Sequence, residues 1–305
     1  MLPDLFKIPI INLPIHTYGV MIVFGLAAAM CAAHAQASRS GYYQEDIVDF
    51  AFWALLGGLL GARLLFIMVE WRYYFVEEPF SVVPGLNISI PTVLAVWKGG
   101  LVFYGAALGG VMAIFVFCKK RKIEIAKFSD LVILVLPLGH AMGRLGCVAA
   151  GCCYGRDNYH IDSTGEIIAN TPFSLAFPKV SIAYGQIHAH AHESTINIMN
   201  KLGTTVPLFP VQLLESFGEI IIFFILLLCT PIKRAHGQIA LTYFILYSVL
   251  RAFTETFRGD IERGFVFGGS LSTSQFIAVL TSIFALFLIA VLQKREIAIK
   301  KQISS

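Results

Sequence analysis

The sequence interrupts a long apolar region with one group of polar and small residues, His140-Ala-Met-Gly-Arg144-Leu-Gly-Cys147-Val-Ala-Ala-Gly-Cys152-Cys153-Tyr154-Gly155. Residues 131–139 before it, Leu-Val-Ile-Leu-Val-Leu-Pro-Leu-Gly, are typical of a membrane-embedded helix. A bare charge at bilayer depth costs at least ~3 kcal/mol, so Arg144 is predicted to be paired, hydrated or bound to an anion. The glycines permit close backbone approach, which a membrane tolerates where the backbone lines a cavity or is buried in protein.

The composition of the whole chain indicates a multi-pass membrane protein. Of 305 residues, 57% are hydrophobic and 14% are charged, and the mean hydropathy is +0.73. A soluble domain carries about 45–50% apolar residues. The net charge of +4 is modest and concentrated in short loops, which favours a role in membrane orientation and argues against a nucleic-acid partner. The first seven residues lack the pattern of a removable signal peptide, so the first span is expected to direct insertion.

Spans of about 20 apolar residues predict an all-α membrane protein with seven transmembrane helices. The expected ranges are 15–37, 47–70, 100–118, 128–147, 210–230, 238–257 and 273–293. Lysines and arginines cluster after the third, fifth and seventh spans, which places those ends in the cytoplasm. The N-terminus is then outside and the C-terminus cytoplasmic, in a single integral membrane domain over residues 1–305.

Two polar segments fall on the predicted outer side. Residues 71–98 combine aromatic residues with three prolines and are expected to lie at the interface as an arm. Residues 148–209 are expected to form a small extracytoplasmic cap, with a strand-like piece at 173–178. His188, His190 and His192 would lie on one side of a strand, where they would bind a metal or, as we favour, form part of a hydrated loop.

Three arginines lie inside or at the outer ends of the apolar spans, and such residues are functional candidates. Arg251 has Glu255 four residues later, so an ordinary helical ion pair is one interpretation. We favour an anion site built from Arg144 and Arg251, because guanidinium groups bind phosphate in a bidentate manner. Arg63 fits either a functional or a structural role.

The glycines around Arg63 support the structural alternative. Gly57 and Gly61 would make a close-packing helix face beside Arg63.

The fifth span begins with two polar residues on one helix face, Gln212 and Glu215. A buried glutamine and glutamate need partners, which Arg144, Arg251 or Arg258 would supply.

The six cysteines fall into two groups. Cys31, Cys118 and Cys229 lie in apolar spans and are interpreted as packing residues. Cys147, Cys152 and Cys153 lie near the predicted outer face, but their spacing does not match a common zinc pattern. We favour apolar packing for them too, and expect neither a metal nor a cofactor.

The segment Gly143–Gly155 resembles the signature of the bacterial prolipoprotein diacylglyceryl transferases. Five more motifs agree with that family in order, and together they cover essentially the whole chain: Pro14-Ile-His-Thr-Tyr18-Gly19, Gly61-Ala-Arg63-Leu64, Gly99-Gly-Leu-Val-Phe-Tyr104-Gly105, Pro210-Val-Gln212-Leu-Leu-Glu215, and Tyr247-Ser-Val-Leu-Arg251-Ala-Phe-Thr-Glu255-Thr-Phe-Arg258-Gly-Asp260.

The resemblance implies an enzyme that moves the diacylglyceryl group of phosphatidylglycerol onto the lipobox cysteine of a lipoprotein precursor. The expected partners are therefore phosphatidylglycerol, precursor signal peptides and the lipid bilayer of the bacterial inner membrane. The arginines would hold the phosphate, two tyrosines would shape the head-group site, and polar residues of the fifth and sixth spans would orient the arginines. The resemblance implies catalytic roles for Arg144, Arg251 and Tyr104, and substrate-binding roles for Tyr18, Arg63, Gly155, Gln212, Glu215, Tyr247, Glu255 and Arg258.

The chain departs from the family pattern at three positions. Some relatives have a histidine, proposed as the base, at the position of Tyr104, and a tyrosine with a pKa of about 10 is a poorer base at neutral pH. Cys147 and Cys152 replace an asparagine and a glutamate of some members. Activation of the substrate thiol is therefore assigned either to hydrogen bonding by Tyr104 or to the positive field of the arginines.

Two other functions remain as alternatives. A lipid or small-anion transporter would also use intramembrane arginines, although the sequence has neither inverted repeats nor paired broken helices. A non-catalytic paralogue that binds lipoprotein precursors is the other alternative.

Overall fold

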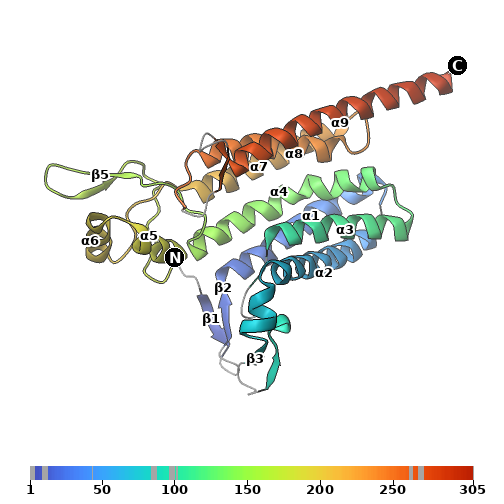
Figure 1. Ribbon diagram of the computed structural model, residues 1–305. Coiled ribbons are helices and arrows are strands. Elements are labelled where there is room, and N and C mark those ends of the chain that lie inside the picture. Colours follow the sequence, from blue (N-terminus) through green and yellow to red (C-terminus); the bar gives the residue numbers. More distant parts are fainter. Residues whose placement is uncertain are drawn as a thin grey trace. The chain divides into compact units, whose positions relative to one another are not determined.

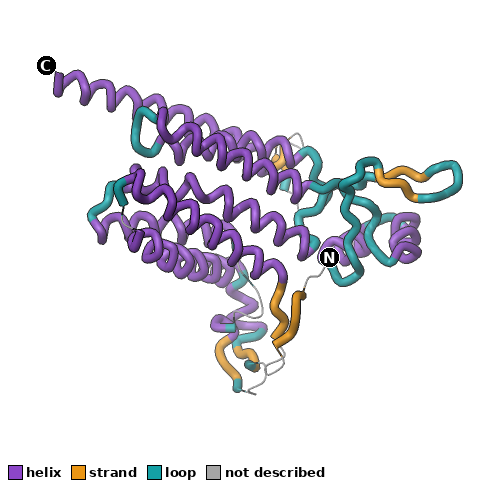
Figure 2. The backbone as a smooth tube through the Cα atoms, turned by 180° about the vertical axis from the view of Figure 1, so that it is seen from behind, coloured by secondary structure: helices purple, strands orange, loops and turns teal. Residues whose placement is uncertain are grey.

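The computed structural model describes residues 4–8, 13–42, 44–83, 88–95, 100, 102–260, 264–266 and 271–304. Long helices dominate, and the strands in this part of the chain form short hairpins (Figure 2). The chain divides into two compact units. Unit 1 comprises Met1–Phe6, Ile15–Ala29 and Ile133–Ser305, and unit 2 comprises Lys7–Pro14 and Met30–Val132. The boundary between the units falls within two long helices, at residues 29–30 and 132–133.

A long helix lies at each of the seven predicted ranges. Five of these helices, those that begin at Thr17, Gln44, Ile125, Val211 and Thr273, are long and apolar enough to cross a membrane. The prediction of a mostly helical membrane protein is thus confirmed, and seven spans remain a prediction. The helices are α1 (Thr17–Ser40), α2 (Gln44–Val69), α3 (Phe103–Arg121), α4 (Ile125–Ala150), α7 (Val211–Cys229), α8 (Gln238–Glu255) and α9 (Thr273–Ser304).

Unit 2 is built on the close approach of α2 and α3. A Cβ atom added at Gly61 would lie 2.3 Å from the carbonyl oxygen of Gly105, and one at Gly57 would lie 3.0 Å from that of Gly109. Small residues let two helix backbones touch and increase their van der Waals contact. The predicted close-packing face at Gly57 and Gly61 is therefore confirmed.

The other end of unit 2 is held by aromatic packing. Phe50, Phe117 and Phe128 are almost fully buried together with Cys118. Phe50 and Phe128 meet edge to face with ring centroids 5.0 Å apart, a favoured aromatic geometry. Cys118 is a packing residue, as predicted.

Residues 71–98 of unit 2 contain short elements. A π-helical turn, Tyr73–Glu77, precedes β3 (Phe80–Val82) and β4 (Ser89–Pro91), which pair in antiparallel fashion, and a 3-10 turn at Thr92–Leu94 follows. Trp97 and Lys98 of the predicted arm lie outside the described residues. The interfacial location of the arm stays a prediction.

Unit 1 is organised around helix packing near the C-terminal half of α4. Helix α8 packs against both α7 and α9 (Figure 1). Ser216 of α7 donates a hydrogen bond from Oγ to the carbonyl oxygen of Ala141 in α4, at 3.0 Å. The first half of α1 also approaches α4, because a Cβ atom at Gly25 would lie 3.0 Å from the carbonyl oxygen of Gly139.

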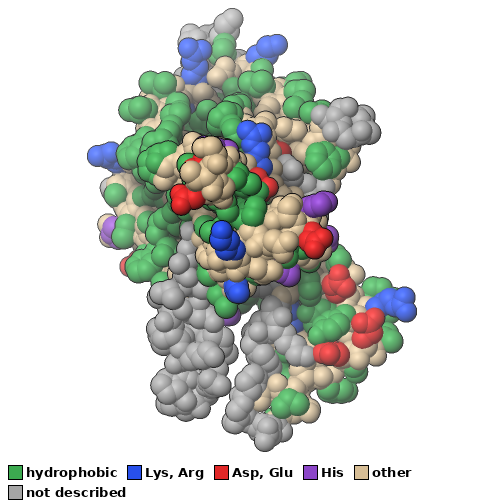
Figure 3. Space-filling view, turned by 90° about the vertical axis from the view of Figure 1, so that its left-hand side faces the viewer, with side chains coloured by type: hydrophobic (Ala, Val, Ile, Leu, Met, Phe, Trp, Pro, Cys, Tyr) green, Lys and Arg blue, Asp and Glu red, His purple; other side chains and the backbone are tan. Residues whose placement is uncertain are grey.

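The segment 151–210 of unit 1 has a small core of its own. It contains the antiparallel hairpin of β5 (Tyr159–Ile161) and β6 (Ile167–Ala169), then α5 (Ile182–His190) and α6 (Glu193–Leu202). Tyr154, Phe177, Met199 and Leu208 are buried beneath these elements. Figure 3 looks onto this segment and shows charged side chains and histidines interspersed with hydrophobic ones. Its location outside the membrane stays a prediction.

Two predicted strands in this segment are wrong. His188 and His190 lie in the last turn of α5, so the three imidazoles do not share one side of a strand. The Oγ of Ser181 accepts a hydrogen bond from the backbone N–H of Tyr184 and caps this helix at its start. In the piece 173–178, Leu175 pairs with Leu208 in an isolated bridge and no strand forms.

The remaining strands form two further hairpins. β1 (Asp4–Ile8) pairs with β2 (Leu13–His16), and β7 (Phe265–Val266) pairs with β8 (Leu271–Ser272) immediately before α9.

Candidate active site

Two arginines from different helices meet at one buried carboxylate in unit 1. The Nη2 atom of Arg144 in α4 lies 2.8 Å from Oε1 of Glu215 in α7, and Nη1 of Arg251 in α8 lies 3.6 Å from the same oxygen. The Glu215 side chain is 1% exposed, and the arginine side chains are 13% and 14% exposed. The structure therefore places both predicted arginines and the predicted Glu215 in one cluster.

A second carboxylate joins this cluster through Arg251. The Nη2 atom of Arg251 lies 2.8 Å from Oε2 of Glu255, one helical turn further along α8, as the spacing predicts. The same nitrogen donates to Oγ of Ser274 in α9, at 3.3 Å. No local pattern indicated Ser274, because this residue reaches the site from a separate helix.

Each of the two arginines has one buried donor that makes no hydrogen bond within the described residues. These donors are Nε of Arg144 and Nη1 of Arg251, of which the latter faces Glu215 only at the ion-pair distance given above. A buried donor without an acceptor costs about 1–3 kcal/mol. An anion placed between the guanidinium groups would satisfy both donors.

The predicted partner of Gln212 is wrong, although its burial is confirmed. Gln212 is 0% exposed, and its Nε2 donates to the carbonyl oxygen of Cys152, at 2.9 Å. Gln212 therefore tethers the loop after α4 to the start of α7, rather than contacting an arginine.

A second buried pair lies next to the arginine cluster and is absent from the predicted site. Nδ1 of His140 lies 2.6 Å from Oε1 of Glu219, whose side chain is 0% exposed. The predicted site residue Tyr247 packs on His140 with ring centroids 5.2 Å apart and stacks on Tyr243 at 5.8 Å. The sequence carried a signal for this pair, because Gln212, Glu215 and Glu219 follow one face of an otherwise apolar helix.

Tyr18 reaches the same region from α1. A Cβ atom at Gly146 would lie 2.8 Å from Cδ2 of Tyr18, so the ring packs directly on the backbone of α4. Arg144 lies close enough to the Tyr18 hydroxyl to act on it electrostatically. The structure thus brings Tyr18 to the cluster, as the resemblance implies.

Arg258 and Gly155 belong to a backbone crossing beside the cluster. The two residues form an isolated antiparallel bridge, and a Cβ atom at Gly155 would lie 2.2 Å from the carbonyl oxygen of Phe209. Only glycine fits such a close approach. Arg258 forms an ion pair with Asp260, with Nε 2.8 Å from Oδ1. Burial lowers the pKa of Arg258, but the hydrogen bond that Arg258 donates to Asp260 and the charges of neighbouring groups, Asp260 first, together outweigh this effect and raise the pKa.

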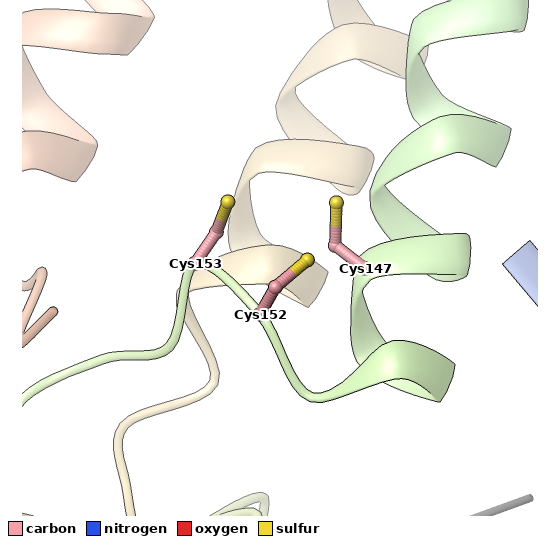
Figure 4. A group of neighbouring side chains, drawn as sticks. All are labelled: Cys147, Cys152 and Cys153. Atoms are coloured by element: carbon pink, nitrogen blue, oxygen red, sulfur yellow. The ribbon is translucent and has the colours of Figure 1, made fainter. Parts of the chain in front are cut away.

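Three free thiols gather at the end of α4. The Sγ atoms of Cys147, Cys152 and Cys153 all lie within 4.8 Å of one another (Figure 4). Hydrogen bonds from the other two thiols, and then the charges of Arg144 and Arg258, lower the pKa of Cys153. Cys152 and Cys153 are only partly buried, which argues against the predicted role in apolar packing.

Two predicted site residues, Arg63 and Tyr104, lie in unit 2. The guanidinium of Arg63 donates to the carbonyl oxygens of Thr92 at 2.9 Å, Val93 at 3.1 Å and Ala95 at 3.3 Å. These bonds fix the turn after β4 and support the structural interpretation of Arg63. Tyr104 lies in the first turn of α3 and is 64% exposed. Catalytic and substrate-binding roles for these two residues stay predictions.

Comparison with known proteins identifies the family. A family model described as prolipoprotein diacylglyceryl transferase matches residues 3–291. The chain is 31% identical to the phosphatidylglycerol–prolipoprotein diacylglyceryl transferase of Clostridium tetani, over 94% of this chain and 96% of the relative. It is 28% identical to the protein of the same name from Serratia proteamaculans, over 91% of this chain and 88% of the relative. The chain therefore belongs to the prolipoprotein diacylglyceryl transferase family.

Proposed function

We propose that this protein transfers the diacylglyceryl group of phosphatidylglycerol to a cysteine thiol of lipoprotein precursors, at the cluster around Glu215. The names of relatives that match the chain over most of its length support the substrates and the reaction. The unsatisfied donors of Arg144 and Arg251 are the single observation that carries the location of the site.

The lipid phosphate would bind between the two guanidinium groups. Arg144, Arg251, Glu215 and Glu255 together carry no net charge, so a phosphodiester anion adds one negative charge beside two cations that Glu215 holds in place. Guanidinium donors suit such an anion because they bind two of its oxygens at fixed geometry. Tyr18 and Tyr247 would line the head-group side, and Glu255 would orient Arg251.

The reaction forms one bond and breaks another. The substrate thiolate forms a sulfur–carbon bond with the glyceryl carbon, and the bond between that carbon and the phosphate oxygen breaks. The electron pair of the broken bond stays on the oxygen of glycerol phosphate, which leaves. Negative charge therefore develops on the leaving oxygen, where Arg144 and Arg251 would stabilise it.

This reaction requires the site to be reached from a membrane. In the proposed topology, the protein spans the bacterial inner membrane seven times, with its N-terminus outside and its C-terminus in the cytoplasm. The segment 148–209 would then act as an extracytoplasmic cap near the precursor's signal peptide, and residues 71–98 as an interfacial arm. The five apolar helices and the family membership support this placement.

The test is a reconstituted assay of the purified full chain with phosphatidylglycerol vesicles and a lipobox peptide. Arg144→Ala and Arg251→Ala should each lower the transfer rate by at least about 100-fold, because removing one preorganised charge donor has an effect of that size. Arg234→Ala is the matched control, since Arg234 is an exposed arginine between α7 and α8.

Folding of the variants is checked in two steps. Each variant should be recovered in the membrane fraction, and after extraction with detergent it should elute from a size-exclusion column at the wild-type volume. Transfer at the wild-type rate by both folded variants would exclude the proposed anion site.

A further inference from the structure

The three thiols at the end of α4 lie where the backbone has folded back on itself. The backbone N–H groups of Gly151 and Cys152 both donate to the carbonyl oxygen of Cys147, at 2.9 and 3.1 Å. Gly151 has a φ of +70°, and a Cβ atom there would lie 2.7 Å from Cβ of Ser181. This glycine-dependent cap ends the helix and turns Cys152 and Cys153 toward Cys147.

The loop that carries these thiols is held in an unusual conformation. Cys153 has a φ of +56°, a left-handed conformation that few residues other than glycine adopt. Gln212 fixes the preceding residue from α7, through the hydrogen bond to the carbonyl oxygen of Cys152. Local strain of this kind persists only where the surrounding structure enforces it.

The spacing of the sulfur atoms suits a tetrahedral metal ion. Zinc–thiolate bonds of about 2.3 Å place the sulfur atoms of a tetrahedral site about 3.8 Å apart. The three Sγ atoms lie within 4.8 Å of one another, so the sulfur atoms would move by about an ångström at most to reach this spacing. Three thiolates leave the fourth tetrahedral position open, as in zinc sites that bind a substrate.

The positive charges of two neighbouring arginines favour a zinc ion bound by thiolates. The three cysteine thiols release their protons to water when Zn²⁺ binds, so the site carries a net charge of −1, which becomes −2 when a fourth thiolate binds. Arg144 lies three residues before Cys147 on the same helix face and is a charge neighbour of both Cys147 and Cys153. Arg258 is a second charged neighbour of Cys153. Both guanidinium groups would stabilise the anionic metal site.

We propose that Cys147, Cys152 and Cys153 bind one Zn²⁺ ion whose fourth position takes the acceptor thiol of the lipoprotein precursor. The inference rests on the proposed function, because it assigns the step that activates the substrate thiol. It also replaces our expectation that these cysteines serve apolar packing and that the protein holds no metal.

The activation step balances without any further reactant. The substrate S–H bond breaks when the sulfur coordinates zinc, and the proton passes to water, because a coordinated thiol is deprotonated outright. The bound thiolate then attacks the glyceryl carbon while the lipid phosphate is held at Arg144. The bond between zinc and the substrate sulfur breaks as the thioether forms, and the fourth coordination position of the zinc ion is free again.

The first test measures metal in the purified full chain. After incubation with Zn²⁺ and removal of the excess, the protein should hold about one zinc ion per chain by elemental mass spectrometry. Cys147→Ser, Cys152→Ser and Cys153→Ser should each lose most of this zinc, and transfer should fall at least about 100-fold, the size of a general-base effect. The matched control is Cys229→Ser, which changes the cysteine at the end of α7 and leaves the cluster intact. This variant should keep both its zinc and its transfer rate.

The second test needs no variant, so it survives any folding defect. Co²⁺ in place of Zn²⁺ should give the visible absorption bands of a tetrahedral thiolate site. A lipobox peptide should shift these bands, whereas the same peptide with serine at the acceptor position should not. This shift reports coordination of the substrate sulfur directly.

The outcomes separate the two proposals. A metal-free protein with full activity, a disulfide among the three cysteines in the active protein, or a cobalt spectrum that the thiol peptide leaves unchanged would each overturn the zinc site and leave the transferase function intact. A zinc-loaded protein that binds the peptide thiol but transfers no diacylglyceryl group would instead overturn the proposed function.

Discussion

The side chain of Glu215 fixes the positions of two arginines. Its carboxylate is 1% exposed and faces Arg144 and Arg251, which come from separate helices. Two guanidinium groups without this carboxylate would repel each other in a water-poor site. Glu215 is therefore central both to the stability of unit 1 and to its proposed anion site.

Removing the charge of Glu215 should destabilise the protein strongly. Glu215→Gln should lower the free energy of unfolding by about 3–5 kcal/mol, because it leaves buried charges without their partner. Glu255→Gln should cost less, since Arg251 keeps its contact with Glu215. Unfolding in mixed micelles measures both variants, and equal stability of Glu215→Gln and the wild type would contradict this account.

Spacing along the chain predicted only part of this cluster. The pair of Arg251 and Glu255 follows from their four-residue separation on one helix. The contact of Arg144 with Glu215 joins residues on different helices, and no local rule predicts it. The resemblance to a family implied that these residues act together, and the structure shows how they meet.

At the scale of single elements, the contact between α2 and α3 depends on the absence of side chains. The glycines at positions 57, 61, 105 and 109 let the two backbones touch. Packing of this kind gives a sharp test, because neighbouring glycines of the same helix differ in the space around them.

Gly61→Ala should destabilise unit 2 by about 1–3 kcal/mol, the usual cost of overpacking. The new Cβ atom would lie 2.3 Å from the carbonyl oxygen of Gly105 and would push α3 away. Gly58→Ala is the control, because its Cβ atom would lie 3.7 Å from the nearest atom, the carbonyl oxygen of Ala106. Both changes gain the same helix propensity, so equal unfolding curves for the two variants would rule out the close contact.

The β5–β6 hairpin depends on one carboxylate in its turn. Oδ1 of Asp162 accepts from Oγ1 of Thr164 at 2.7 Å and from the backbone N–H of Glu166 at 2.8 Å. These hydrogen bonds, with that from Thr164 the strongest, lower the pKa of Asp162 below 3.8. The carboxylate therefore stabilises the turn above pH 3.8, and this contribution is lost as the pH falls through the lowered pKa.

Asp162→Ala should reproduce the low-pH state at neutral pH. Amide hydrogen exchange of Glu166 should become faster at pH 7, whereas Glu166→Gln, which keeps the backbone bonds of the turn, should leave the exchange of Asp162 and its neighbours unchanged. Unaltered exchange in Asp162→Ala would show that the carboxylate does not hold the hairpin.

Helix α5 shows why local patterns mispredicted this part of the chain. Alternating histidines at 188, 190 and 192 indicate a strand, but Ser181 caps a helix that runs through the first two. The capping serine was a usable signal. The burial of Tyr184 and Met199 in the core of the segment, which stabilises α5 and α6, is a tertiary effect that the sequence does not display.

For the whole molecule, the distribution of charge predicts an orientation in the membrane. Lys119, Lys120, Arg121 and Lys122 end α3, whereas the segment 151–210 lies after the opposite end of α4. By the positive-inside rule, the basic end faces the cytoplasm. Residue 122 should then be cytoplasmic and residue 163 external.

Labelling with a membrane-impermeant maleimide tests this orientation in intact spheroplasts. In a chain without native cysteines, Ser163→Cys should react at once, and Lys122→Cys should react only after the membrane is opened. The reverse pattern would invert the proposed topology, and reaction of both residues in intact cells would exclude it.

The long apolar helices were the most predictable feature of the molecule. Each of the seven ranges holds a helix, because about 20 consecutive apolar residues leave few other structures in a membrane. Helices α3 and α8 are not among the five that are long and apolar enough to cross a membrane, and the polar residues of α8 include Arg251 and Glu255 of the site. Ionisable residues inside a span cost free energy, so their presence indicates a functional site.

The measurement that tests the central claim most directly follows both products of the wild-type protein at once. Purified protein, phosphatidylglycerol and a lipobox peptide are combined, and the mass gain of the peptide is recorded together with the release of glycerol phosphate. The account predicts that one glycerol phosphate appears for each diacylglyceryl group gained, and that a peptide with serine in place of the acceptor cysteine gives neither. Release of glycerol phosphate without peptide modification, or no reaction with a competent lipid and peptide, would contradict the account.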